Sequence, residues 1–127
     1  MASEILSKLK NIFLNAEDVE FAYLFGSCAY ENAFPTSDID IAVYMCRETA
    51  FFDKEMELHA VLSRALKSNA VDLVFLNRTK NIILLEEIVR SGKIVCDRNP
   101  QLRETFELNV LHNAMDFKYQ RKVFAGI

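Results

Sequence analysis

The chain has 127 residues, 51% hydrophobic and 26% charged, so we expect one globular domain, residues 1–127, with a proper core. Fifteen Lys and Arg against eighteen Asp and Glu give a net charge of −3, which excludes a nucleic-acid binder that relies on positive charge alone. No apolar run reaches the ~20 residues of a membrane span. The three cysteines are scattered, which favours a reducing cytoplasm over a disulfide framework or a thiolate metal site.

The first half of the chain shows two helix patterns and two strand patterns. Apolar residues recur at helical spacing over residues 4–15. Val19–Phe25 is dense in β-branched and aromatic residues, which predicts a strand ending at Gly26-Ser27, and a second strand is predicted over Asp38–Met45. Residues 49–68 are predicted to form a helix. Its apolar side is expected to consist of Phe52, Met56, His59 and Leu66.

The second half predicts a strand, a helix and a strand before the last helix. The third strand covers Val71–Leu76, the next helix covers Ile82–Ser91, and Gly92 stands at the C-cap position of that helix. Lys93–Asp97 is a short fourth strand. Asn99 is a good N-cap residue, and Pro100 suits the first position of a helix, where its missing N–H is not needed.

The last helix carries two apolar faces. One face consists of Leu102, Phe106, Val110, Phe117 and Phe124, and the nearly opposite one of Leu108, Leu111, Met115 and Tyr119. Because a helix lying on a small domain buries one face, the second face is expected to meet another chain, either a partner or a second copy. The alternative is a helix sandwiched within its own domain.

Acidic residues form the most informative pattern. Asp38 and Asp40 flank Ile39 at the start of the second strand, so their side chains project from the same face. Two carboxylates at ~5 Å repel by about 3 kcal/mol at an effective dielectric near 20, which favours a site that holds a cation. Hard oxygen ligands of this kind suit Mg²⁺, which usually takes one or two carboxylates together with water and substrate phosphates.

Two further features complete this pattern. Asp72 interrupts an otherwise apolar third strand, and a carboxylate there is costly unless it is paired or bound to metal. If that strand lies beside the second, three carboxylates converge, enough for two metals or for one metal and a general base. Gly26 would let the backbone approach a phosphate, and Ser27 offers a hydroxyl and an N–H. In the structural alternative, Asp38 is a turn residue, Asp40 an edge charge and Asp72 part of a salt bridge.

At these residues the sequence resembles a known family. Phe25-Gly26-Ser27 followed by residues 37–43, Ser-Asp-Ile-Asp-Ile-Ala-Val, is similar to the signature of nucleotidyltransferases related to DNA polymerase β. The chain length, the strand around Asp72 and the tail from Asn99 to Tyr119 resemble the minimal nucleotidyltransferase (MNT) antitoxins, which pair with HEPN-class toxins. The resemblance covers nearly the whole chain.

The resemblance implies an α/β fold (α+β), with a short mixed β-sheet and flanking helices. It implies Mg²⁺-dependent transfer of AMP from ATP to a tyrosine hydroxyl of a HEPN-type ribonuclease toxin, which the transfer silences. Gly26 and Ser27 would hold the triphosphate, and Asp38 and Asp40 would bind metal. Asp72 would bind the second metal and help to deprotonate the incoming hydroxyl.

The sequence departs from this family at one point and leaves two rival functions open. Glu31 replaces a glycine that many relatives have, and residues 28–37 contain no basic side chain. Arg78 and Lys80, which follow the third strand, are expected either to reach a phosphate or to be solvated loop charges. One rival is an antitoxin that neutralises its partner by contact, with no catalysis. The other is a nucleotidyltransferase of small molecules such as aminoglycosides, although 127 residues leave no room for an acceptor-binding domain.

Overall fold

The computed structural model describes residues 2–26, 29, 38–46, 51–67 and 70–125. These residues form α1 (Ala2–Leu14), β1 (Val19–Phe25), β2 (Ile39–Met45), α2 (Phe51–Leu66), β3 (Val71–Phe75), α3 (Ile82–Ser91), β4 (Lys93–Asp97) and α4 (Pro100–Ala125). Each predicted element is present, with ends that shift by one or two residues. None of the helices in this described part combines the length and the apolar character that crossing a membrane requires.

The four described strands form one mixed sheet in the order β3-β2-β1-β4. β1 is antiparallel to both of its neighbours, β2 and β4, whereas β3 runs parallel to β2. The expected α/β fold with a short mixed sheet is therefore confirmed. Because β3 is parallel to β2, both strands begin at the same edge of the sheet.

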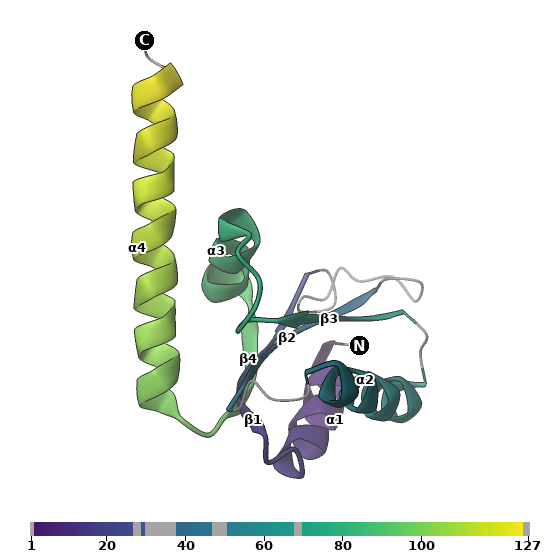
Figure 1. Ribbon diagram of the computed structural model, residues 1–127. Helices are drawn as coiled ribbons and strands as arrows, with labels where there is room; N and C mark the ends of the chain where they lie inside the picture. Colours follow the sequence, from purple (N-terminus) through teal and green to yellow (C-terminus); the bar gives the residue numbers. More distant parts are fainter. Residues whose placement is uncertain (1, 27–28, 30–37, 47–50, 68–69, 126–127) are drawn as a thin grey trace.

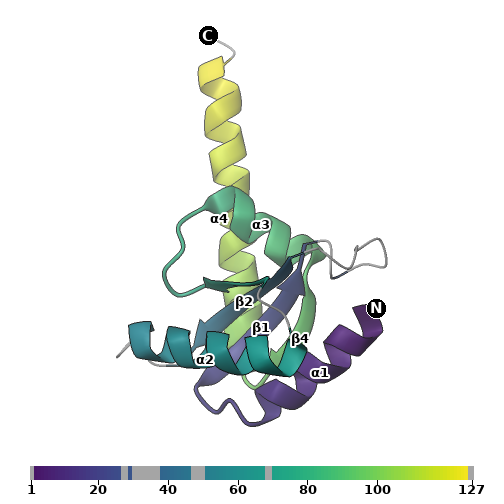
Figure 2. The ribbon, with the colours of Figure 1, turned by 90° about the vertical axis from the view of Figure 1, so that its right-hand side faces the viewer.

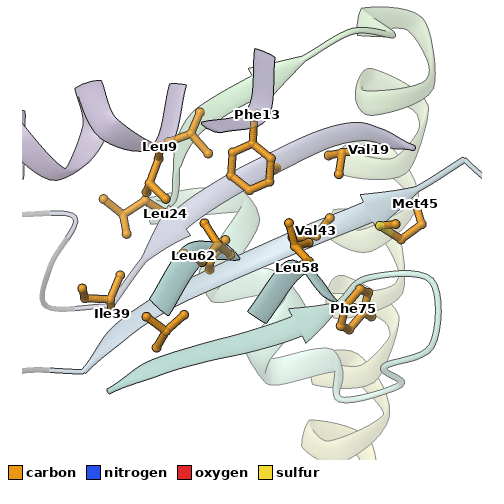
Figure 3. Close-up of a cluster of buried hydrophobic side chains, with 14 of the residues drawn as sticks. Leu9, Phe13, Val19, Leu24, Ile39, Val43, Met45, Leu58, Leu62 and Phe75 are labelled. Atoms are coloured by element: carbon orange, nitrogen blue, oxygen red, sulfur yellow. The ribbon is translucent and has the colours of Figure 1, made fainter. Parts of the chain in front are cut away.

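Helices cover both faces of the sheet (Figures 1 and 2). α1 and α2 lie on one face, where Leu9 and Phe13 of α1 and Leu62 of α2 join Ile41 and Val43 of β2 in a buried cluster (Figure 3). On the other face a second cluster joins Phe21, Tyr23 and Ala42 of the sheet to Ile88 of α3 and to Leu102 and Phe106 of α4. The sheet is thus the middle of three layers.

The apolar side of α2 differs from the sequence-based expectation. Among the described side chains of α2, Leu58 and Leu62 are buried and Leu66 packs partly against the same cluster, as expected for Leu66, whereas Met56 is 59% exposed. The side chain of Phe52 lies outside the described residues. His59 lies outside the core, and its Nε2 contacts the Val71 carbonyl oxygen of the edge strand β3 at 2.9 Å. The sequence contains two overlapping stripes at helical spacing, and Leu58 and Leu62 belong to the one that packs on β2 and β3.

The base of α4 is fixed as the sequence predicts. The Asn99 side chain accepts a hydrogen bond from the Leu102 N–H at 3.2 Å, and Pro100 is the first helical residue. Arg103 then bridges Asp97 of β4 and Glu107, at 3.0 and 2.9 Å, and Glu107 accepts the Tyr23 hydroxyl at 2.7 Å. Side-chain hydrogen bonds therefore tie the first turns of α4 to β1 and β4.

A single guanidinium closes the C-terminal end of α1. Arg98, directly after β4, donates to the carbonyls of Phe13, Leu14, Ala16 and Val19, with distances of 2.6 Å to Phe13 and 2.9 Å to Leu14. The last carbonyls of a helix lack partners within the helix and carry partial negative charge, so a cation is well placed there. Arg98 thereby joins the end of α1 to the end of β4.

We expect Arg98→Ala to lower the free energy of unfolding by about 2 kcal/mol, because several carbonyls lose a charged donor. Arg98→Lys should recover only part of this, since an ammonium lacks the planar fork that reaches several carbonyls. The matched control is Arg90→Ala, which removes an exposed pair with Glu86 and should cost less than ~1 kcal/mol. Urea denaturation measures all three, and equal effects of Arg98→Ala and Arg90→Ala would contradict the assignment.

Candidate active site

Two carboxylates meet where β2 and β3 begin. The parallel register pairs Asp40 with Asp72, and on the other side of β2 the antiparallel register pairs Asp40 with Phe25, the last residue of β1. Asp38 is exposed and lies one residue before β2. The edge of the sheet at which β1 ends and β2 and β3 begin therefore gathers the acidic positions that the sequence singles out.

Both of the paired aspartates face the layer that contains α3 and α4. Ile39 and Ile41 belong to the cluster under α1 and α2, whereas Ala42 belongs to the cluster under α3 and α4. Since side chains two residues apart share a face, Asp40 lies on the same face as Ala42. Asp72 is on that face too, because paired residues of adjacent strands point to the same side. The expectation that Ile39 and Ile41 enter the core is confirmed.

Gly26 makes room for the Asp40 carboxylate. Its φ is +73°, in the left-handed region that side chains disfavour. A Cβ atom built on Gly26 would lie 2.3 Å from Asp40 Oδ2 and 3.2 Å from Asp40 Cγ, closer than real contacts allow. Glycine is therefore required here twice, once by the backbone angle and once by the close approach of a carboxylate.

The site is rich in negative charge. Burial, followed by the carboxylates of Asp72, Asp38 and Glu87, raises the pKa of Asp40 to about 6. Glu87 was not among the sequence candidates. Glu87 lies on α3, next to the buried Ile88. α3 runs from the end of β3 back to the start of β4, which pairs with the end of β1. The last turns of α3 therefore lie at this edge of the sheet. No sequence motif identifies Glu87. Only the path of α3, from the end of β3 back to the start of β4, indicates that Glu87 lies near Asp40.

The residues at this edge fit a magnesium ion that is shared with a substrate. Carboxylate oxygens are the ligands that Mg²⁺ prefers, and the parallel register places those of Asp40 and Asp72 on adjacent strands. Across the described ranges, no three His, Cys, Asp or Glu side chains are grouped so that they could hold a metal ion. The pair of Asp40 and Asp72 by itself supplies the one or two carboxylates that Mg²⁺ usually takes, with water and substrate phosphates completing its shell, and the structure does not bring Asp38 into a three-carboxylate cluster with them.

The remaining candidates lie elsewhere. Ser27 and Glu31 fall outside the described residues. Arg78 lies in the turn after β3, at the opposite end of that strand from the start at Asp72, where it contacts Glu55 at 2.7 Å. The structure therefore places Arg78 away from the acidic edge. Lys93, which the sequence argument passed over, opens β4 opposite Leu24, near the end of β1.

Comparison with known proteins gives a consistent result. The family described as "Polymerase beta, Nucleotidyltransferase" matches residues 7–101. A chain from a toxin–antitoxin crystal structure with AMP-PNP is 28% identical, with a TM-score of 0.75 and coverage of 94% of this chain and 95% of that one. Comparison with curated proteins gave no match.

Two further solved structures extend this picture. A chain from tri-AMPylated Shewanella oneidensis HEPN toxin in complex with MNT antitoxin is 27% identical, with a TM-score of 0.70 and coverage of 99% and 97% of the two chains. A chain from an MntA–HpeT toxin–antitoxin mutant, in which two aspartates two positions apart are changed to glutamate, is 25% identical, with a TM-score of 0.74 and coverage of 99% and 96%. All three matches span α4 as well as the sheet.

We expect Gly26→Ala to destabilise the chain by about 2 kcal/mol, through the left-handed backbone and the contact with Asp40. A double-mutant cycle separates these causes, because Asp40→Ala removes both of the closest atoms. In the Asp40→Ala background, Gly26→Ala should cost clearly less, with the backbone contribution remaining. Urea denaturation of the four chains measures the coupling, and an equal cost in both backgrounds would show that the carboxylate does not press on Gly26.

We expect Asp40→Asn to raise the melting temperature at pH 7.5 in magnesium-free buffer, but not at pH 3.5. The pKa of Asp40 rises from 3.8 to about 6 on folding, so the folded chain binds its proton more tightly than the unfolded chain. Wild-type stability therefore falls as pH rises through this window, and asparagine escapes that loss. Scanning calorimetry measures the difference, with the exposed Asp116→Asn as control. A gain of the same size at both pH values would rule out this origin.

Proposed function

Because the chain belongs to the polymerase beta nucleotidyltransferase family, we propose that it transfers AMP from ATP to a tyrosine hydroxyl of a HEPN-type toxin and thereby acts as its antitoxin. The observation that supports this most is the pairing of Asp40 with Asp72 beside the left-handed Gly26, at the edge where β1 ends. The carboxylates of Asp40 and Asp72 can bind a metal ion, and the backbone at Gly26, which has no side chain, can approach a phosphate. Together they suit a metal-bound triphosphate.

Asp38, Asp40 and Asp72 are the residues that would hold Mg²⁺ in this proposal. When bound, the ion would neutralise the charge that builds up on the triphosphate during transfer. Gly26, whose missing side chain leaves room for the Asp40 carboxylate, would offer its backbone to the triphosphate, and Ser27 would contribute its hydroxyl and N–H. The triad itself stays a prediction, which the Asp40–Asp72 register supports.

The chemistry asked of these residues is mainly positioning. The tyrosine oxygen attacks the α-phosphorus of ATP, the bond from that phosphorus to the bridging oxygen breaks, and pyrophosphate leaves. The proton of the tyrosine hydroxyl goes to Asp72, which lies beside Asp40 on the same face of the sheet. The expected products are an AMP-tyrosine phosphodiester and pyrophosphate.

The partner is inferred from the solved relatives. One relative comes from a crystal with AMP-PNP, an ATP analogue, and another from a crystal in which the HEPN toxin carries three AMP groups. Both match this chain over at least 94% of its length. The same class of nucleotide and the same class of acceptor are therefore the ones we assign to it.

Neutralisation by contact alone is the second candidate. It is favoured by one observation, the exposed apolar face of α4, because such a face can bind a partner whether or not the carboxylates act. This candidate makes the paired aspartates dispensable, so labelling of the partner separates the two functions.

We expect the chain, mixed with Mg²⁺, ATP labelled at the α-phosphate and its HEPN-class partner, to place label on a tyrosine of that protein. Asp38→Asn and Asp40→Asn should each lower the rate at least ~100-fold without unfolding the chain, since each removes a proposed metal ligand. Asp53→Asn, at an exposed position of α2 on the other face of the sheet, is the matched control and should transfer at the wild-type rate. Peptide mapping identifies the labelled residue.

Three results would count against this assignment. Inhibition of the toxin without label on it would favour contact alone. Full transfer by both aspartate variants would mean that the metal site lies elsewhere, and label that persists in EDTA would remove the requirement for a divalent ion.

A further inference from the structure

The exposed side of α4 carries a continuous apolar strip. Leu108, Met115, Tyr119 and Val123 are 68%, 65%, 69% and 42% exposed, and their spacings of seven, four and four residues place them on one face of the helix. We call this set the α4 strip. The other large apolar side chains that are exposed in the described part of the chain are spread over α1, α2, α3 and β4. α4 also extends well past α3 (Figures 1 and 2).

The fold of the chain itself leaves the α4 strip uncovered. Val110 and Ala114, on the opposite face of α4, are buried, and Phe106 packs on the cluster that contains Phe21 and Tyr23. The helix is therefore not sandwiched within its own domain. Leu111, which the sequence groups with the strip, is half-buried and lies at its border.

The charge beside the α4 strip is opposite to that of the chain. Residues 116–122 contain three cations, Lys118, Arg121 and Lys122, and one carboxylate, Asp116, in a protein of net charge −3. Lys118 contacts Glu86 of α3 at 2.9 Å, and Arg121 lies over the Phe117 ring. Lys122 is exposed beside the strip. A partner surface with acidic residues around an apolar groove complements this end of the helix.

The size of the α4 strip argues against a dimer formed through it alone. Four exposed side chains present a few hundred Å², so two copies would cover roughly 800 Å², in the range of crystal contacts and below the ~1,200 Å² of a stable specific interface. A larger partner that covers the strip and also contacts the domain formed by the sheet and the other helices would bury more than this area. The solved relatives, which come from complexes with a toxin, match this chain over a length that includes α4.

We propose that the α4 strip docks the acceptor protein of the transfer reaction, which would present an apolar groove with an acidic rim. This inference rests on the proposed function for the identity of the partner. It separates two tasks: the edge of the sheet at Asp40 and Asp72 handles the nucleotide, and the strip recognises the protein that carries the acceptor hydroxyl.

The test places two carboxylates on the strip and, as a matched control, two on another exposed side of the same helix. The strip variant is Leu108→Asp with Met115→Asp, and the control is Asn109→Asp with Asn113→Asp, both in the full chain. With a HEPN-class toxin as probe, titration calorimetry should show affinity at least 30-fold weaker for the strip variant and within threefold of wild type for the control. Melting temperatures of the two variants should agree, because all four positions are exposed or face solvent.

Label transfer gives a second readout. The strip variant should raise KM for the acceptor protein and leave kcat and Mg²⁺–ATP binding unchanged, because the strip lies outside the nucleotide site. Binding of the acceptor by the wild-type chain without label would sustain the docking surface and defeat the proposed transfer. Wild-type affinity in the strip variant would overturn docking whether or not label is transferred.

Two more outcomes overturn the proposal. An equal loss of affinity in the strip variant and the control would show an effect of added charge rather than of the strip. A wild-type dimer that becomes a monomer in the strip variant, with the affinity for the acceptor unchanged, would assign the strip to a second copy of this chain.

Discussion

The parallel register of β2 and β3 is the constraint on which the rest of the site depends. It places two carboxylates, Asp40 and Asp72, side by side, where like charges and burial act against the fold. A slip of one residue would turn Asp72 to the other face of the sheet and relieve this repulsion. The structure resists such a slip at both ends of β3. At its end the Asn77 side chain bonds to the Met45 N–H and carbonyl at 2.7 and 2.9 Å, and at its start His59 contacts the Val71 carbonyl.

The sequence predicts the elements of this fold well and their relative placement poorly. Local signals act within a few residues: Asn99 and Pro100 begin α4, and the run of apolar residues in Val19–Phe25 marks β1. The sequence predicts that Asp40 and Asp72 meet only if the third strand lies beside the second. It does not predict that strand order or register, because both are decided by packing between strands that are distant in sequence. Glu87 was invisible to motif reading for the same reason, since a helix that returns across the sheet brings it near Asp40.

Contacts of α3 and α4 with the sheet connect the candidate site at the sheet edge to α4, the proposed docking helix. Gly92 joins α3 to β4, and its N–H bonds to the Ile88 carbonyl at 2.8 Å. A Cβ there would lie 2.4 Å from that same oxygen, so the tight exit from α3 requires glycine although its φ of −70° does not. Tyr23 lies two residues before the end of β1 and donates to Glu107 of α4. Burial and the Glu107 carboxylate raise the pKa of the Tyr23 hydroxyl, so it remains a donor at physiological pH.

Charge and apolar surface are divided between two parts of the molecule, and this division sets what each part can recognise. The sheet edge at Asp40 and Asp72 is acidic, so a nucleotide triphosphate meets repulsion there unless a divalent cation accompanies it. Under the proposed function, such an edge would select a metal–nucleotide complex and offer little to distinguish one acceptor protein from another. The α4 strip is apolar with a basic flank, features that distinguish proteins by shape and charge. Since the helix is held to β1 through Glu107 and Tyr23, a protein seated on it is fixed relative to the strand that ends at Gly26. Selection of the acceptor can then rest on α4, while the carboxylates handle only the charge of the transfer.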